Sequence, residues 1–470
     1  MAHLLISAAH KSSGKTTVTL GLCAALRQRG IRVQPFKKGP DYIDPMWLSR
    51  ASGRSCHNLD FYTMGREEIL SVFVRHMAGA DVGLIEGNKG LYDGLDLDGS
   101  NSNAALASLL GAPVVLVLDA RGMTRGIAPL VLGYQAFDPD VRIAGVILNQ
   151  VGGSRHESKL RTILEHYTDV AVLGAIHQDA GLQISERHLG LVPSNESVRA
   201  EEQIRHVAAA VASQVDVDRL IELAARAAMP TVPIPATIPP PAPDVRIGVA
   251  RDSAFGFYYP GDLDALRAAG AELIEFSTLT ATQLPCVDGL FIGGGFPETH
   301  MHQLESNAPL RAEVRTAIEG GLPVYAECGG LMYLARSIRW RDDTCAMVGV
   351  VPADVVMHER PQGRGYIRLK ETGSGLWPLG PGGQIICGHE FHYSSLERLG
   401  DGLEFAYEVV RGTGIDGAHD GIILRNLQAN YAHLRDVEGN RWAERFVAFV
   451  RRCRTGRAGS PVSASPGAPR

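Results

Sequence analysis

The sequence predicts an α/β protein whose first domain is a doubly wound parallel sheet and whose second domain is a further alternating α/β region. From residue 3 to about 230, short apolar runs rich in β-branched residues alternate with helical segments, the pattern of a parallel sheet covered by helices. The alternation stops where seven prolines fall between residues 230 and 243, and it resumes at Val245. Proline fixes φ and lacks an N–H, so this stretch is expected to be an extended linker. The predicted segments are domains at 1–228 and 245–453, a linker at 229–244 and a disordered tail at 454–470.

The spacing of apolar residues predicts the individual elements. In the first domain, the expected strands are Leu4–Ala8, Ile31–Phe36, Val82–Ile85, Val114–Leu118 and Ile143–Leu148. The helices expected between them are Lys15–Gln28, Arg66–Met77, Asn103–Leu110 and Thr124–Ala136. In the second domain, strands are expected at Val245–Ala250 and Leu322–Ala326, followed by a helical run from Leu331.

Composition narrows the class of protein. A chain of 470 residues is too long for one core, and 45% hydrophobic with 21% charged residues is typical of a globular protein. A net charge of -5 gives no overall attraction for nucleic acid or an anionic membrane, so neither is an expected partner. The seven cysteines show no C-x-x-C spacing, which disfavours a disulfide framework or structural zinc and indicates a reducing, cytoplasmic location.

Cys328 is the candidate nucleophile of the second domain. It stands between the apolar run Leu322–Ala326 and the helical run from Leu331, so a strand is expected to turn into a helix at the cysteine. Such an elbow exposes the sulfur, and the helix dipole favours the thiolate. A lone cysteine is more often a small buried hydrophobe. Here Gly329 and Gly330 follow it, and they suit the close approach of backbone or substrate that a nucleophile requires.

Two further features would complete this centre. The cluster Gly293–Glu298 contains Gly294 and Gly295, whose backbone N–H groups are candidate oxyanion donors. His433 is the candidate base, because a thiol nucleophile needs a partner that takes and returns its proton.

A phosphate-binding loop is predicted at the first strand-to-helix turn. The stretch ends in Gly-Lys-Thr, but Ala9 stands where the usual pattern has its first glycine. A chance Gly-Lys-Thr is common, yet its place after an apolar run and before a helix favours nucleotide binding. Lys15 is expected to reach the β- and γ-phosphates, Thr16 to bind magnesium and Lys11 to add a second cation. The candidate nucleotide-binding residues are Lys11, Ser12, Ser13, Gly14, Lys15, Thr16 and Thr17.

Charged loops follow the next strands of the first domain. The stretch Lys37–Pro45 is either a solvated loop or, at the carboxyl edge of the sheet, a site for metal phosphate and an anionic substrate. Glu86 is placed to coordinate magnesium, and Lys89 and Asp93 lie in the following loop for substrate or phosphate contacts. Asp119 is either a further acidic contributor or a helix cap.

Two stretches of the second domain allow two interpretations each. The aromatic run Ala254–Pro260 is a core cluster by default, and exposed it would suit a flat macrocycle or a domain interface. The stretch Gly388–Ser394 holds two histidines and a glutamate, which is the composition of a metal site. Their spacing matches no common zinc pattern, which disfavours metal binding.

Taken together, these motifs resemble the cobyrinic acid a,c-diamide synthase family over about residues 3 to 450. The resemblance rests on the phosphate loop, Lys38–Pro45, Glu86 with Gly90–Gly94, Glu186–Leu191, Ala254–Tyr259, Gly293–Glu298, Ala326–Gly330 and His389–His392, in that order. Each motif is common alone, but the ordered combination is specific.

The resemblance implies a dethiobiotin-synthetase-like ATP domain joined to a class I glutamine amidotransferase domain. It implies ATP and Mg²⁺ as cofactors and L-glutamine and a tetrapyrrole as substrates, and a homodimer is one possible assembly. The implied reaction is amidation of two acetate side chains through an acyl phosphate, with ammonia released at Cys328 and carried through a closed passage. The residues implied for substrate are Asp41, Tyr42, Asp44, Lys89 and Asp93, and those implied for metal are Thr16, Asp41 and Glu86.

Two departures from the family pattern bear on the substrate and on the base. Asn88-Lys89 stands where the family commonly has Val-Met, and a lysine there suits a further substrate carboxylate, which keeps sirohaem or nickel-sirohydrochlorin open as substrates. Arg435 stands where many amidotransferases carry the carboxylate that orients the base, leaving Asp436, Glu438 or Glu390 as candidates.

Three other functions remain open at this level. One is an ATP-dependent ligase or kinase whose second domain only resembles an amidotransferase. Another is a P-loop partitioning or regulatory ATPase, a class that shares Lys11 but does not need the Cys328 elbow. The third is a tetrapyrrole carrier or sensor that does not turn over ATP.

Overall fold

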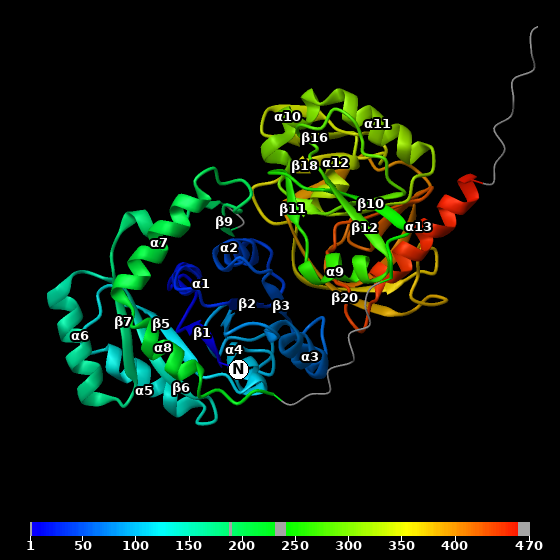
Figure 1. The fold of residues 1–470 in the computed structure, drawn as a ribbon. Helices are drawn as coiled ribbons and strands as arrows, with labels where there is room; N and C mark the ends of the chain where they lie inside the picture. The colour runs from blue at the N-terminus through cyan, green and yellow to red at the C-terminus, as the bar shows by residue number, and fades with distance from the viewer. Residues whose placement is uncertain (1, 188–189, 231–240, 459–470) are drawn as a thin grey trace, which may run out of the picture. The chain divides into compact units, whose positions relative to one another are not determined.

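The computed structural model describes residues 2–187, 190–230 and 241–458. Its contacts divide the chain into two compact units, Met1–Ala236 and Thr237–Arg470 (Figure 1). Most of the predicted linker 229–244, residues 188–189 of the Glu186–Leu191 motif and the tail from residue 459 lie outside the described residues.

The first unit is built on a seven-stranded sheet with the order β3-β2-β4-β1-β5-β6-β7. Every neighbouring pair of strands is parallel. The strands are β1 (Ala2–Ala8), β2 (Val33–Lys38), β3 (His57–Leu59), β4 (Val82–Glu86), β5 (Val114–Asp119), β6 (Ile143–Val151) and β7 (Ala171–His177). The helices are α1 (Lys15–Gln28), α2 (Ile43–Ser52), α3 (Arg66–Met77), α4 (Asn103–Leu110), α5 (Ile127–Phe137), α6 (Ser154–Tyr167), α7 (Ala200–Gln214) and α8 (Val217–Ala224). A 3₁₀ turn, Ala180–Leu182, and the short pair β8 (Glu186–Arg187) and β9 (Gly190–Leu191) complete the unit.

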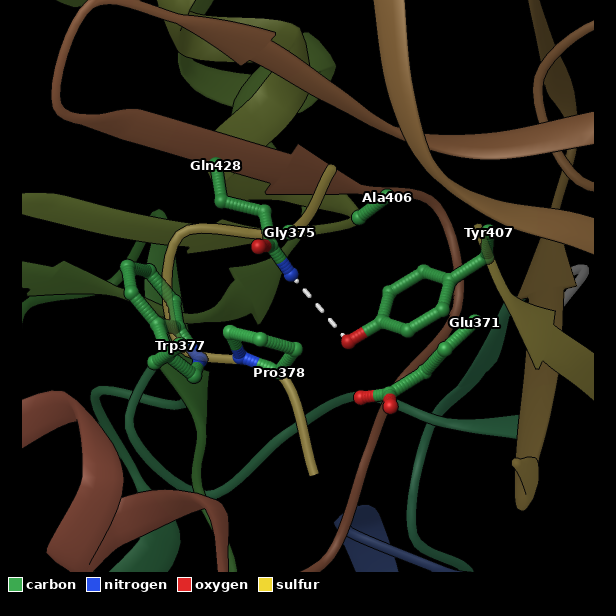
Figure 2. A pocket seen from close by; sticks show the side chains of 7 residues that line it. All are labelled: Glu371, Gly375, Trp377, Pro378, Ala406, Tyr407 and Gln428. Carbon is green, nitrogen blue, oxygen red and sulfur yellow. Dashed lines mark hydrogen bonds between the residues drawn. The ribbon is translucent and has the colours of Figure 1, made fainter. Parts of the chain in front are cut away.

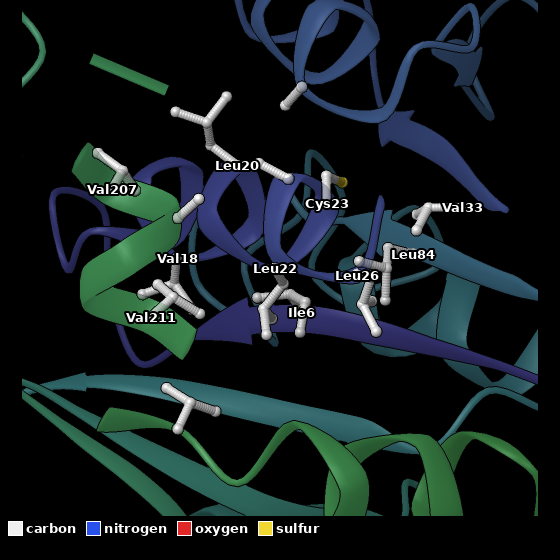
Figure 3. Packing of buried hydrophobic residues seen from close by; sticks show 14 of the residues in the cluster. Ile6, Val18, Leu20, Leu22, Cys23, Leu26, Val33, Leu84, Val207 and Val211 are labelled. Carbon is white, nitrogen blue, oxygen red and sulfur yellow. The ribbon is translucent and has the colours of Figure 1, made fainter. Parts of the chain in front are cut away.

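Helix α1 carries much of the core of this unit. Its residues Val18, Leu22 and Leu26 are fully buried, and Figure 3 shows Leu22 beside Ile6 of β1. Helix α7 packs closely on α1 at Gly21, where a Cβ atom would lie only 2.4 Å from a methyl carbon of Val211. This packing fixes the start of α1, and with it the phosphate loop, above the carboxyl end of β1.

The predicted parallel sheet is confirmed, but several of its elements differ from those expected. Helices α1, α3 and α4 have the predicted bounds, whereas α5 begins at Ile127 rather than Thr124. The expected elements did not include strands β3 and β7 or helices α2, α6, α7 and α8. The stretch Lys37–Pro45 was predicted to be a loop, but α2 begins at Ile43, with Pro45 in the first helical turn where a missing N–H is tolerated.

The second unit contains a nine-stranded sheet with the order β12-β10-β13-β15-β24-β23-β22-β19-β20. The strands are β10 (Val245–Ala250), β12 (Ala271–Phe276), β13 (Gly289–Ile292), β15 (Val324–Glu327), β19 (Gly363–Glu371), β20 (Ile385–His392), β22 (Glu404–Arg411), β23 (His419–Leu424) and β24 (Leu427–Asn430). Neighbours are parallel from β12 to β24 and antiparallel from β24 to β20, so the sheet is mixed rather than wholly parallel.

Smaller elements cover this sheet. A four-stranded sheet joins β17 (Asp343–Ala346), β16 (Ser337–Trp340), β18 (Asp354–Met357) and β21 (Ser394–Glu397), and β11 (Phe255–Phe257) pairs with β14 (Gly294–Gly295). The helical elements are α9 (Pro260–Ala268), the 3₁₀ turn η2 (Pro297–His300), α10 (Met301–Ser306), α11 (Ala308–Glu319), α12 (Gly329–Leu334) and α13 (Trp442–Ala458). Within the described ranges, no helix combines the length and apolarity needed to cross a membrane.

The structure answers what the sequence left open about the aromatic run Ala254–Pro260 and about the start of the C-terminal tail. The aromatic run forms core, because Phe255, Tyr258 and Tyr259 are all buried. The tail predicted from Arg454 was placed too early, because α13 continues to Ala458. Its first residue, Trp442, is fully buried and anchors the helix in the core.

We predict that Leu22→Ala lowers the free energy of unfolding of the first unit by about 2–5 kcal/mol. The Leu22 side chain is fully buried, so its removal leaves a cavity in the core. A urea titration followed by circular dichroism measures the change. Leu132→Ala on α5 is the matched control, since that side chain is 42% exposed and its loss is expected to cost little. Equal midpoints for the two variants would contradict this account of the core.

Candidate functional site

The strand-to-helix turn at Cys328 is present in the second unit as predicted, but the expected exposure of the sulfur is wrong, because Cys328 is buried. Cys328 lies between the last residue of β15 and the first of α12, with φ at +47°, a conformation that L residues rarely adopt. Its N–H donates to the Asn430 carbonyl at 2.8 Å, which ties the turn to the end of β24. A Cβ atom at Gly330 would lie 2.1 Å from the Ile292 carbonyl oxygen, so the turn requires glycine there.

His433 follows β24 and is held against this elbow. Its backbone N–H and C=O both pair with His389 of β20, and the two imidazole rings stack with centroids 4.9 Å apart. Gly294 packs closely on the same imidazole ring. A Cβ atom on Gly294 would come within 2.6 Å of the His433 ring. The imidazole is therefore fixed by packing on two sides.

Glu327 faces the Nδ1 side of His433. Its Oε2 lies 3.4 Å from His433 Nδ1, and both side chains are almost fully buried. Its Oε1 accepts hydrogen bonds from the Tyr325 hydroxyl at 2.5 Å and from the Leu434 N–H at 2.9 Å. The carboxylate is thus locked in place, and Nε2 of His433 is left for the thiol of Cys328.

The charges at this centre favour a protonated imidazole. Burial by itself lowers the pKa of His433, but Cys328 and Glu327 outweigh it and raise the pKa to about 10. Stacked beside it, His389 has its pKa held well below the usual value by burial and by the positive charges of His433 and Arg435. One imidazole is therefore set to carry a proton while its neighbour stays neutral.

Glu327 is a residue that the sequence analysis missed. The carboxylates considered there are engaged elsewhere: Asp436 accepts from Ala443 at the start of α13, and Glu390 accepts from Thr413 and Gly414. Glu438 is exposed. The available signal was the position of Glu327 directly before the nucleophile, but neighbours along a strand ordinarily point to opposite faces.

The predicted oxyanion loop lies at the elbow. Gly294 and Gly295 form the short strand β14, and a Cβ atom on Gly329 would lie 2.9 Å from the Gly295 nitrogen. The structure therefore brings this backbone next to the nucleophile turn, and the role of its N–H groups as oxyanion donors stays a prediction.

In the first unit, the predicted phosphate loop joins β1 to α1. Gly14 has φ at +88° and leaves no room for a side chain, because its Cβ position lies 2.1 Å from the Asn149 amide nitrogen. That amide donates to the Ser13 carbonyl at 2.9 Å and braces the loop. Lys15 is buried, whereas Lys11 and Ser12 are exposed at the loop tip.

Acidic side chains converge beside Thr16. The Thr16 hydroxyl donates to Glu86 at 2.9 Å and approaches Asp44 at 3.3 Å. Lys37 bridges the same carboxylates, 2.5 Å from Asp44 and 2.6 Å from Glu86. Asp41 lies farther out, 3.7 Å from Lys37, and its other oxygen accepts from the N–H groups at the start of α2.

This oxygen cluster fits a magnesium ion. Glu86 is fully buried, and its Oε2 has no hydrogen-bond partner among the residues that the structure describes. With Thr16 and Asp44 it offers the hard oxygen ligands that Mg²⁺ prefers, next to the loop for phosphates. The geometry places Asp44 rather than the expected Asp41 in contact with Thr16.

The lysines around the cluster repel one another. Burial and Lys37 lower the pKa of Lys15 to about 8, with nearby carboxylates opposing the shift. Burial, together with Lys89 and Lys37, lowers the pKa of Lys38 to about 8 against the pull of Asp60. An arriving anion would relieve this repulsion, so the site is electrostatically suited to phosphate and carboxylate.

The remaining predicted contacts are placed less directly. Tyr42 is buried at the start of α2, and Lys89 is exposed near Lys38. Asp93 accepts from the Gly90 N–H at 2.9 Å within its own loop. Asp119 neither caps a helix nor joins the acidic cluster, because it pairs with Arg121.

Comparison with known proteins agrees with both units. Residues 5–192 match a family model described as a CobQ/CobB/MinD/ParA nucleotide binding domain, and residues 246–439 match a CobB/CobQ-like glutamine amidotransferase domain. A protein of Magnetococcus marinus named cobyrinate a,c-diamide synthase is 49% identical, covering 95% of this chain and 97% of its own. Proteins of the same name from Methanosarcina acetivorans and Archaeoglobus fulgidus are 42% and 41% identical, over 97% and 94% of this chain and 96% of each relative.

The chain belongs to the cobyrinate a,c-diamide synthase family. Arg435, which the sequence showed two residues after His433, packs against an aromatic ring. Its guanidinium lies 4.7 Å from the centre of the Tyr259 ring, so the residue packs behind the histidines rather than orienting His433.

A pocket in the second unit is lined by residues other than Cys328, His433 and Glu327. Figure 2 shows Gln428 and Tyr407 meeting in it, with the amide donating to the hydroxyl at 3.1 Å. Glu371 in the same pocket accepts from the Leu379 N–H at 2.8 Å. The pocket has no room for a water molecule, so it is part of the packed interior.

The His433 pKa predicts a pH dependence of stability. The folded chain holds this proton with a pKa of about 10, against an ordinary value of 6.5. The stabilisation is therefore complete below pH 6.5 and is lost as the pH rises towards 10. We predict that the free energy of unfolding falls over this range in the unmodified chain, and that His433→Gln removes this part of the fall.

Urea titrations at a series of pH values measure this effect. His166→Gln, at an exposed position in the first unit, is the matched control and should keep the slope of the unmodified chain. If His433→Gln keeps that slope as well, the raised pKa is wrong.

Proposed function

We propose that the chain is a glutamine-hydrolysing ligase that converts cobyrinate to cobyrinate a,c-diamide with ATP. The observation that carries the proposal is that one chain holds a buried Cys328–His433–Glu327 centre and a phosphate loop beside an oxygen cluster. Family membership over 95% of the chain supports the substrate, since the relatives are named for it.

In the second unit, the proposed reaction releases ammonia from glutamine. The Cys328 sulfur attacks the side-chain amide carbon, and the N–H groups near Gly294 and Gly295 stabilise the developing oxyanion. His433 gives its proton to the leaving nitrogen, so that ammonia departs and a thioester remains. Water, deprotonated by His433, then cleaves the thioester to glutamate and restores the thiol. Glu327 holds the imidazole in the orientation that these transfers need.

In the first unit, the proposed reaction activates a carboxylate. An acetate oxygen of the substrate attacks the γ-phosphorus of ATP, which releases ADP and leaves an acyl phosphate; ammonia then displaces phosphate to give the amide. Lys15 neutralises charge on the transferred phosphoryl group. Thr16, Glu86 and Asp44 would hold Mg²⁺, which supplies further charge neutralisation when bound.

The substrate proposal also uses the lysines at the carboxyl edge of the sheet. Cobyrinate carries several carboxylates, and Lys38 and Lys89 offer cationic partners beyond the group that reacts. Lys89 also makes sirohaem or sirohydrochlorin the alternative substrate, with the same mechanism. A cytoplasmic location is proposed from the seven cysteines, all of which are free.

We predict that the purified chain with magnesium, ATP and glutamine forms a diamide from cobyrinate, detected by product mass. Cys328→Ser should abolish the glutamine-dependent reaction and keep the reaction with ammonium salts, because only ammonia release needs the thiol.

Parallel tubes with sirohaem test the alternative substrate. Product from sirohaem alone would move the chain to a different tetrapyrrole, and ATP binding without product in any tube would favour the regulatory ATPase. Equal loss of both nitrogen sources in Cys328→Ser would contradict the assigned role of the thiol.

Glu327→Gln is predicted to lower kcat for glutamine hydrolysis by at least roughly 10-fold, because a neutral amide no longer holds the protonated imidazole. The KM for glutamine and the ammonia-dependent activity should change little, a split that a general loss of structure would not produce. The matched control is Glu438→Gln, at an exposed position in the segment after His433. Equal kcat values for the two variants would remove Glu327 from the mechanism.

A further inference from the structure

A mixed cluster of metal-binding side chains lies on the second unit, apart from the residues of the Cys328 centre. His302 and Glu305 project from α10, and Cys345 lies on β17. One ligand atom from each of the three lies within 4.8 Å of the other two, and His302 Nδ1 is 3.2 Å from the Cys345 sulfur. The sulfur is buried at the base of the cluster, while His302 is largely exposed.

The surroundings of this cluster orient its ligand atoms. His302 Nε2 lies 3.3 Å from Asp343 Oδ2, the carboxylate–histidine arrangement that commonly fixes a metal-binding imidazole. Glu305 Oε1 accepts from the Ala346 N–H at 2.7 Å, which anchors that carboxylate beside the sulfur. The histidine, the thiol and the carboxylate thus each bring one ligand atom to within 4.8 Å of the other two.

We propose that His302, Glu305 and Cys345 bind a divalent transition metal of the zinc class. Imidazole, thiolate and carboxylate are the ligands of Zn²⁺, and oxygen-seeking Mg²⁺ would not select the sulfur. Tetrahedral coordination spaces ligand atoms about 3.5 Å apart, so small rotations of the two surface side chains on α10 complete the site. Binding replaces the thiol proton, which passes to solvent, and water takes the fourth position.

The position of the cluster gives the metal a structural consequence. Helix α10 begins directly after η2, and η2 directly follows the Gly293–Phe296 stretch that packs on the Cys328 turn. A metal bound there would join the far end of this segment to the β16–β17 hairpin. The site goes beyond the proposed reaction, which needs no zinc.

The test uses the full chain under reducing conditions, with Cys328→Ser so that the catalytic thiol cannot bind the probe. We expect Co²⁺ to give a thiolate-to-cobalt charge-transfer band that saturates at one equivalent and disappears on addition of Zn²⁺. Adding Cys345→Ser should remove the band, whereas adding Cys286→Ser, at an exposed cysteine elsewhere, should leave it unchanged. Asp343→Asn should weaken affinity by roughly 10-fold while keeping the stoichiometry.

Thermal unfolding separates loss of the site from loss of the fold. Zn²⁺ should raise the Tm of the Cys328→Ser chain and not that of the same chain carrying His302→Ala, a change at an exposed position that leaves the core intact. Absence of the band, its survival in Cys345→Ser, or an equal Tm shift with His302→Ala would each overturn the proposal.

Discussion

The pairing of Glu327 with His433 is the interaction on which the second unit's centre depends. Both groups are nearly excluded from water, where an unpaired charge is costly and a paired one interacts strongly. The Tyr325 hydroxyl and the Leu434 N–H donate to the other carboxylate oxygen, so both oxygens of Glu327 have a polar partner. The carboxylate thereby helps to keep the pKa of His433 above its usual value, which favours a protonated imidazole beside Cys328.

The first unit also contains a buried charge that is stabilised by partners of opposite sign. There a buried cation, Lys37, lies among Asp41, Asp44 and Glu86. Burial would lower its pKa, but the carboxylates outweigh burial and hold the pKa well above the usual value. Because Lys37 shares its carboxylate partners with Thr16, the same oxygen atoms are held together before any metal or nucleotide arrives.

Much of the fold and of both centres was predictable from the sequence, because local patterns carried the information. Apolar spacing gave α1 and α3 their bounds, and glycines beside Lys15 and Cys328 marked the two tight turns. The residues missed are those whose partners are set by tertiary packing. Helix α2, which brings Asp44 to Thr16, begins in a stretch whose prolines indicated a loop. The cluster of His302 and Cys345 joins elements that are far apart in the sequence, and its spacing matches no common zinc pattern.

The positive φ at Cys328 explains how adjacent residues can serve one imidazole. On a regular strand, Glu327 and Cys328 would point to opposite faces, and only one of them could reach His433. The +47° turn ends the strand at this step and redirects the cysteine, while β24, which pairs with β15 up to Glu327, leads the chain on to His433. The absence of side chains at Gly329 and Gly330 makes that turn possible in a packed interior. The backbone strain at Cys328 and the position of the Glu327 carboxylate are thus one structural feature, and relaxing the turn would separate the thiol from the imidazole that Glu327 holds.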